Sequence, residues 1–227
     1  MRFIFKRKLM RDLVWLIVRI YKYPSYKKFL LSLSDTKMSL FNINTPVKEI
    51  VNNIEINGAV EGPRLPDRIV KNVYDFALSN DCYADRDVKN NFLLENYDII
   101  CKKLNKEVLV AQYFNVIKDL PLVKELSEDP YLLEIAARYL KTKPKLVGTN
   151  LWWTFPVDAS LEDKNKHAHV FHYDLDDVNF IKFFFYITDV TELDGPHVYV
   201  RGSNREILYK NTWFRSKRFT DQEVIAA

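Results

Sequence analysis

The pattern of hydrophobic and polar residues along this chain changes at about residue 145. Before it, apolar residues recur every three or four positions, which is the spacing of helices that bury one face. Asn-Gly, Gly-Pro and single Pro residues interrupt this part. The pattern predicts helices over residues 8–22 and 46–55, helices that begin near Pro66 and Pro130, and broken helical structure over 95–127.

After this change the sequence is typical of β-structure. Residues 146–155 (LVGTNLWWTF) and 180–190 (FIKFFFYITDV) are rich in β-branched and aromatic residues, and 197–200 predicts a short strand before a turn. Helices followed by strands indicate an α+β fold. The remaining residues, about eighty, are few for a closed sandwich or barrel of seven or eight strands. We therefore expect a helical part over 41–144 and an incomplete β-rich part over 145–227.

Composition and charge exclude some classes of function. The chain has 227 residues, which is enough to bury a hydrophobic core without disulfides or structural metal ions. Its two cysteines, Cys82 and Cys101, form no C-x-x-C motif and predict reduced thiols in a cytoplasmic protein. The formal net charge of +4 is uneven, because residues 1–30 hold nine Lys or Arg against one acid. The remaining residues carry 25 basic against 29 acidic groups, so no general nucleic-acid-binding surface is expected.

The basic start of the chain, residues 1–40, is predicted to form an amphipathic arm. Its apolar run, 13–18, is too short to span a bilayer, and no signal-peptide cleavage site follows it. Two interpretations remain open: residues 1–24 contact an anionic membrane surface, or they form a helix that packs on the body and leaves a basic face in solvent. Both use the aliphatic residues that recur at helical spacing, namely Leu9, Leu13, Leu16, Ile17 and Ile20.

All four histidines lie between residues 167 and 197, and three fall in the stretch HAHVFHYDLDD. His172 is followed two residues later by Asp174, and side chains at i and i+2 of a strand project from the same face. One imidazole and one carboxylate at this spacing are two of the three ligands in the 2-His-1-carboxylate iron(II) site. A His-x-Asp step is also frequent by chance, and the alternative is a surface loop with a salt bridge.

The stretch around this pair resembles the core motif block of the phytanoyl-CoA dioxygenase-like family of 2-oxoglutarate-dependent oxygenases. In that family the His-x-Asp pair precedes an apolar strand, a short acidic turn, a Gly-Pro step and a strand that ends in a Gly-Ser-His turn. The resemblance covers residues 130–205, extends more loosely back to residue 45 and leaves 1–40 outside. The matching parts here are His172 and Asp174, residues 180–190, residues 191–194, Gly195-Pro196 and Gly202-Ser203.

The resemblance implies a double-stranded β-helix, a cupin-like jelly roll, with residues 41–227 as the dioxygenase-like domain. His172 would be the first metal histidine and Asp174 the metal carboxylate, with Fe(II) as cofactor and 2-oxoglutarate as cosubstrate. The implied activity is hydroxylation of an aliphatic C–H of an unidentified small molecule.

The chain departs from the family pattern in two places. Asn204 stands where the turn usually has histidine, and no histidine follows His197. The family's second metal histidine and its 2-oxoglutarate-binding basic residue lie after this turn, so we expect the C-terminal strands to be missing. The alternative function is that of a truncated, catalytically inactive member acting as a binding or membrane-surface protein.

Further polar side chains near the motif are candidates for the same site. His197 is the only downstream histidine that could replace the missing ligand, and the alternative is a partly buried sheet residue. His167 and His169 are expected in a mobile loop, with pocket lining or binding of a stray metal as the alternative. Lys182 interrupts an apolar strand, where burying it unpaired is costly. It is a candidate to bind the acidic cosubstrate, and the alternatives are an amine that reaches the rim or a partner for Asp174, Asp176 or Asp177.

Overall fold

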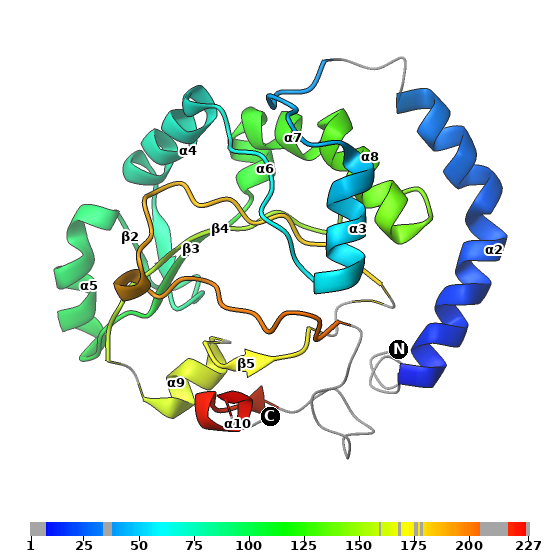
Figure 1. Ribbon diagram of the computed structural model, residues 1–227. Coiled ribbons are helices and arrows are strands. Elements are labelled where there is room, and N and C mark those ends of the chain that lie inside the picture. The colour runs from blue at the N-terminus through cyan, green and yellow to red at the C-terminus, as the bar shows by residue number, and fades with distance from the viewer. Residues whose placement is uncertain are drawn as a thin grey trace.

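The computed structural model describes residues 8–33, 38–158, 160–167, 169–174, 177, 179–204 and 218–225. Within them the chain is an α+β protein with helices around two small antiparallel sheets (Figure 1). The helices are α2 (Lys8–Leu33), α3 (Val47–Asn57), α4 (Asp67–Ser79), α5 (Tyr97–Leu104), α6 (Val116–Asp119), α7 (Pro121–Ser127), α8 (Pro130–Leu140), α9 (Leu161–Lys166) and α10 (Asp221–Ile225), with 3-10 turns η1 (Leu94–Asn96) and η2 (Glu192–Asp194). The strands are β1 (Cys82–Ala84), β2 (Asn91–Phe92), β3 (Val110–Tyr113), β4 (Leu151–Thr154), β5 (Phe171–His172) and β6 (Arg218–Phe219).

The larger sheet has four antiparallel strands in the order β2-β1-β3-β4. The run 108–111 leads into the inner strand β3, and its four residues are at most 4% exposed. Val108 and Ala111 belong to one of the two core clusters, together with residues of α4, α5, β1 and β2. The prediction of β-structure near 146–155 is confirmed by β4. The prediction that 41–144 is helical is wrong for β1, β2 and β3, which are too short to show a periodic pattern.

The second core cluster joins α3, α4 and α8 with Phe41. The predicted helices over 46–55 and from Pro66 and Pro130 are confirmed. Asp129 fixes the start of α8, since its buried carboxylate accepts hydrogen bonds from the backbone N–H groups of Tyr131 and Leu132. Gly58 ends α3 with φ +88°, a left-handed conformation that favours glycine.

Residues 180–190 run as an extended chain, but no strand is assigned to them (Figure 1). The prediction of strands over 180–190 and 197–200 is therefore wrong for these described residues. The physical reason is visible in the packing, because Ile181, Phe185 and Ile187 lie against the helical core cluster instead of a neighbouring strand. Phe185 stacks on Phe41 with ring centroids 5.9 Å apart. No closed or curled sheet is present among the described residues.

The predicted turn at 201–203 docks on the C-terminal end of α3. The Gly202 N–H donates to the carbonyl of Asn57 at 2.6 Å, and Asn204 Nδ2 donates to the carbonyl of Ile54 at 3.3 Å. A Cβ added at Gly58 would lie 3.0 Å from Asn204 Oδ1. Asn204, which stands where the resembled family has histidine, thus adds a second donor to the Ile54 carbonyl, which also accepts from the Gly58 N–H at 2.8 Å, and donates to the Glu55 carbonyl at 3.4 Å.

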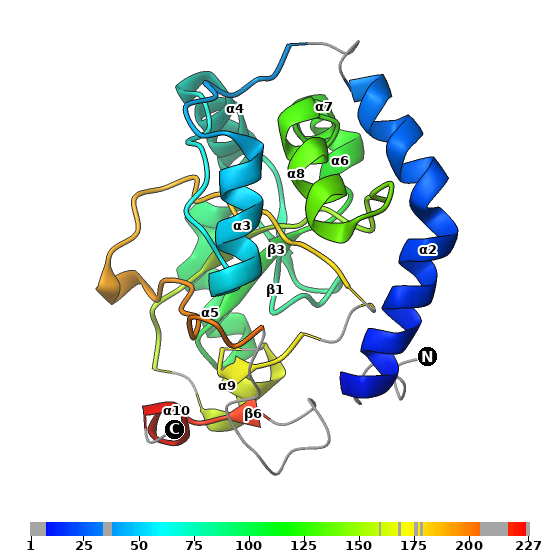
Figure 2. The same cartoon turned by 45° about the vertical axis from the view of Figure 1, so that its right-hand side comes forward.

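The first described helix, α2, is longer than predicted. It continues through Pro24 to Leu33, although we expected this proline to interrupt it. The helix contacts α8, and both views place it along one side of the molecule (Figure 2). Near its C-terminal end the ring of Phe29 lies 5.7 Å from Lys143 Nζ. No described helix is long and apolar enough to cross a bilayer.

Candidate functional site

The His-x-Asp pair lies at the smaller sheet, where β5 pairs with β6. The antiparallel register joins Phe171 to Phe219 and His172 to Arg218. Phe219 is 5% exposed, and Tyr173 packs edge-on against it with ring centroids 6.2 Å apart. The aromatic side chain of Tyr173 therefore anchors the segment on one side, while the flanking His172 and Asp174 converge on each other.

The two predicted ligands do face each other. His172 Nε2 lies 3.2 Å from Asp174 Oδ1, and His172 Nδ1 lies 2.7 Å from the carbonyl oxygen of Val170. A carbonyl oxygen only accepts, so Nδ1 carries a proton and Nε2 is the nitrogen directed at the carboxylate. The hydrogen bond with Asp174 raises the pKa of His172 above its ordinary value, outweighing the lowering effect of burial. The same hydrogen bond, followed by that from Lys182, lowers the pKa of Asp174.

Lys182 is bound to the same carboxylate. Its Nζ lies 2.6 Å from Asp174 Oδ2 and 5.4 Å from the centroid of the Phe180 ring. Both side chains of the ion pair are 40% exposed, so water screens the pair strongly. The structure thus brings together the three predicted site residues His172, Asp174 and Lys182. It shows the ion pair with Asp174 that was one of the alternatives for Lys182; Asp176 lies outside the described residues.

His197 lies close enough to this cluster to respond to its charges. Burial lowers the pKa of His197, the charge of Asp174 raises it, and those of His172 and Lys182 lower it further. Its ring stacks on Phe184 with centroids 4.8 Å apart, and its backbone N–H donates to the Tyr186 hydroxyl at 2.8 Å. Among the described residues, no group of three His, Cys, Asp or Glu side chains is placed to hold a metal ion. His197 is therefore near the pair without completing a metal site.

A second polar cluster lies where the end of α9 approaches the larger sheet, and sequence reasoning missed it. His167 is 4% exposed, and its Nε2 lies 3.7 Å from Asp85 Oδ1. Lys106 Nζ lies 2.5 Å from Asp85 Oδ2. Asp85 Oδ1 also accepts a hydrogen bond from the Leu109 N–H at 3.1 Å. The expectation that His167 belongs to a mobile loop is wrong, since it follows α9 directly and is buried; His169 is exposed.

The charges of this cluster oppose each other. Burial alone would raise the pKa of Asp85, but the hydrogen bond and charge of Lys106 outweigh it and the pKa is lowered. Burial lowers the pKa of His167, against the attraction of Asp85. Asp85 and Arg86 both adopt positive φ without being glycine, at 49° and 67°. Neither position carries the glycine that usually marks such a turn, although Asp adopts positive φ more often than most residue types.

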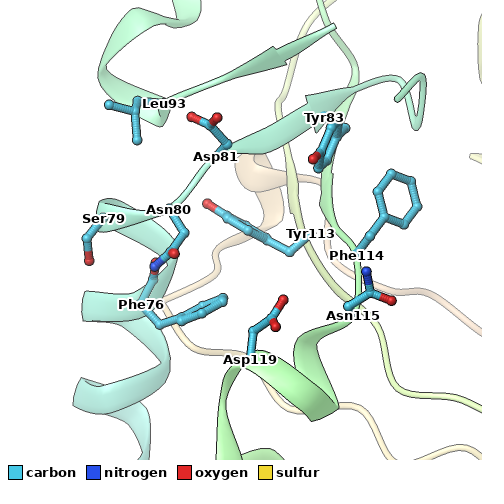
Figure 3. A pocket seen from close by; sticks show the side chains of 10 residues that line it. All are labelled: Phe76, Ser79, Asn80, Asp81, Tyr83, Leu93, Tyr113, Phe114, Asn115 and Asp119. Carbon is cyan, nitrogen blue, oxygen red and sulfur yellow. The ribbon is translucent and has the colours of Figure 1, made fainter. Parts of the chain in front are cut away.

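A hollow of about 480 Å³ lies away from the His-x-Asp pair, between the end of α4, β1, β3 and α6 (Figure 3). The Tyr113 ring lies near its centre, with the carboxylates of Asp81 and Asp119 on two sides. Tyr113 donates to the carbonyl of Ala77 and accepts from Trp153 Nε1 at 2.9 Å. The Tyr113 hydroxyl therefore already makes two hydrogen bonds within the protein. None of the predicted site residues lines this hollow.

Comparison with known proteins adds no assignment: no family model, no curated protein and no solved structure matches the chain.

Proposed function

We propose that this chain is a dioxygenase-like protein that uses Fe(II) and 2-oxoglutarate, with His172 and Asp174 as two of the iron ligands. The observation that supports the proposal is the convergence of His172 Nε2 and Asp174 Oδ1 at 3.2 Å. Two cis ligands of one metal, each about 2.1 Å from it, lie about 3.0 Å apart. The spacing of these two donors fits a shared ion.

The surroundings of His172 also suit a metal ligand. Its Nδ1–H donates to the carbonyl oxygen of Val170, and this kind of contact commonly fixes the ring orientation of metal-binding histidines. Metal binding at Nε2 requires that its proton leaves. The donor set is nevertheless incomplete among the described residues, which supply two convergent ligands and not three.

Bound Fe(II) would supply the oxidative chemistry that, with dioxygen and 2-oxoglutarate, hydroxylates an aliphatic C–H. The chain's own residues then have distinct roles in this proposal. His172 and Asp174 bind the cation, and Lys182, 2.6 Å from Asp174, holds a positive charge where a dicarboxylate cosubstrate would need it.

The test is an anaerobic titration of the purified chain with Fe(II) and 2-oxoglutarate. The expected result is the weak visible charge-transfer absorption of an iron–oxoacid complex, lost in His172→Ala and in Asp174→Ala. The exposed His169 offers a matched control, and His169→Ala should retain the absorption. Absence of the absorption from the wild-type chain, or its survival in His172→Ala, would sink the proposal.

A second candidate is a non-catalytic member of the same family that acts as a binding protein. The observation in its favour is that both oxygens of Asp174 already have partners, His172 at one and Lys182 at the other. In this alternative the cluster is a polar network in which the Lys182 ammonium occupies the position of a metal ion beside Asp174. Stoichiometric binding of 2-oxoglutarate without any metal, and no succinate formed on adding Fe(II), would favour it over the enzyme.

A further inference from the structure

The helix α2 exposes its aliphatic side chains. Leu9, Leu13, Leu16, Ile17 and Ile20 recur on one face, and their exposed fractions are 83, 54, 49, 58 and 69%. We call these five residues the aliphatic stripe. The side chains that are only partly exposed lie elsewhere on the helix, among them Trp15, Tyr26 and Leu30. Within the part of the chain that the structure describes, this apolar face has no partner and faces solvent, the reverse of the arrangement in which a first helix packs its apolar face on the body.

Exposure of such a stripe is costly unless something covers it. Isolated apolar side chains at a surface are ordinary, but a contiguous patch marks an interaction site. In both views α2 lies at the side of the molecule, and no labelled element lies beyond it (Figures 1 and 2). The stripe therefore needs an occupant that the described residues do not provide.

The charge of the helix indicates the chemistry of that occupant. Residues 8–33 contain six Lys or Arg and one acid, Asp12. Lys27 lies seven residues after Ile20, which places it on the same face just beyond the stripe, and the next residue, Lys28, is also exposed at the edge of that face. An occupant must accept aliphatic side chains and meet several positive charges at the same time. An anionic lipid surface offers both, acyl chains below and phosphate or carboxylate groups above.

The aromatic residues of the same helix fit that surface as well. Tyr21 and Tyr23 are 77% and 50% exposed, and each ring lies about 5 Å from a lysine amine, Lys22 and Lys27 respectively. Tyrosine with an adjacent long cationic side chain suits the headgroup layer, because the ring and the methylene stem meet apolar groups while the hydroxyl and ammonium stay wet. No described helix could cross the bilayer, which leaves a helix lying in the interface.

We propose that α2 docks this protein on anionic membrane surfaces, inserting the aliphatic stripe below the headgroups while Lys27 and Lys28 contact the lipid phosphates or carboxylates. The site is independent of the His172–Asp174 pair, so it stands or falls separately from the proposed oxygenase function.

The experiment is co-sedimentation of the full chain with vesicles of phosphatidylcholine alone and of phosphatidylcholine mixed with phosphatidylserine. The wild type should pellet with the anionic vesicles, far less with the neutral ones, and less as salt is added. Leu13→Ser/Ile17→Ser removes two exposed side chains of the stripe and should weaken binding at least tenfold. Lys27→Glu/Lys28→Glu should weaken binding to anionic vesicles by a similar factor.

The matched control is Val147→Ser/Leu193→Ser, which removes two aliphatic side chains that are 85% and 87% exposed outside α2. It should pellet as the wild type does, and circular dichroism should show that every variant keeps its helix content. Equal pelleting of the wild type and the stripe variant would overturn the proposal, as would no pelleting at all. If the wild type instead self-associates without vesicles and the stripe variant does not, the occupant is a second copy and the membrane proposal is wrong.

Discussion

Removing the charge of Lys182 should change two affinities in opposite directions. The affinity for a divalent metal should rise, and the affinity of the metal-loaded protein for 2-oxoglutarate should fall. The Lys182 ammonium lies 2.6 Å from Asp174 Oδ2, while His172 Nε2 approaches the other oxygen. A divalent cation held by His172 and Asp174 would sit within about 5 Å of the ammonium, where a doubly charged and a singly charged cation repel by about 1–2 kcal/mol at the dielectric of water. The water value applies because both members of the pair are 40% exposed.

Lys182→Met should therefore tighten binding of a divalent metal roughly five- to thirtyfold. Lys182→Arg keeps the charge and should leave the affinity near that of the wild type. The assay is anaerobic titration with Co(II), followed by its visible absorption, in low salt. Lys145→Met removes an exposed lysine elsewhere and controls for the change in net charge.

The same variant reports on the cosubstrate. If Lys182 contacts a carboxylate of 2-oxoglutarate, Lys182→Met should weaken binding of that acid to the metal-loaded protein while metal affinity rises. Unchanged or weaker metal affinity in Lys182→Met would refute the reasoning, because it would mean that the ammonium does not oppose a cation at this carboxylate.

Three further variants test the rest of the structure by urea denaturation. Asp129→Ala should lower the free energy of unfolding by about 3 kcal/mol, because the buried carboxylate that starts α8 also accepts from the Leu40 N–H at 2.7 Å. Asp129→Asn keeps one acceptor oxygen and should lose less stability. Equal losses in the two variants would contradict this prediction. Gly58→Ala should lower the free energy of unfolding by about 1–3 kcal/mol, because its φ is +88° and the added Cβ would meet Asn204. The loss should be smaller in an Asn204→Ala background, and additive losses would exclude the contact. Burial lowers the pKa of His167, so its contribution to stability is complete above the ordinary histidine pKa and is lost as pH falls toward the folded value. The wild type should therefore lose more stability than His167→Gln between about pH 7.5 and pH 5, and equal losses would refute the assignment.

The sequence was most informative where structure is local. The helices α3, α4 and α8 carry their own periodic apolar faces and their own end signals, Gly58 for the first and Asp129 for the last. The convergence of His172 and Asp174 follows from their i, i+2 spacing next to a strand. Each of these features depends on residues that are close neighbours in the chain, so the local sequence pattern is enough to predict it.

What the sequence did not reveal depends on distant contacts. Strands of two to four residues, such as β1 and β2, are too short for any period to be visible. The approach of His167 to Asp85 joins residues that lie far apart in the chain, and no local pattern encodes it. Residues 180–190 have strong β-forming composition, yet whether they form a strand depends on a neighbour, and here the helical core covers their apolar side chains instead.

That extended segment has a consequence for how the protein behaves in concentrated solution. An extended segment that pairs with no strand among the described residues can pair its backbone with another copy, and Phe184 and Tyr186 within this segment are 49% and 57% exposed. Lys182 places a charge inside this run, and charges in such runs discourage edge-to-edge pairing. One lysine thus acts against aggregation as well as at the candidate site. Variants that remove its charge should be handled dilute, because they are the ones most prone to precipitate.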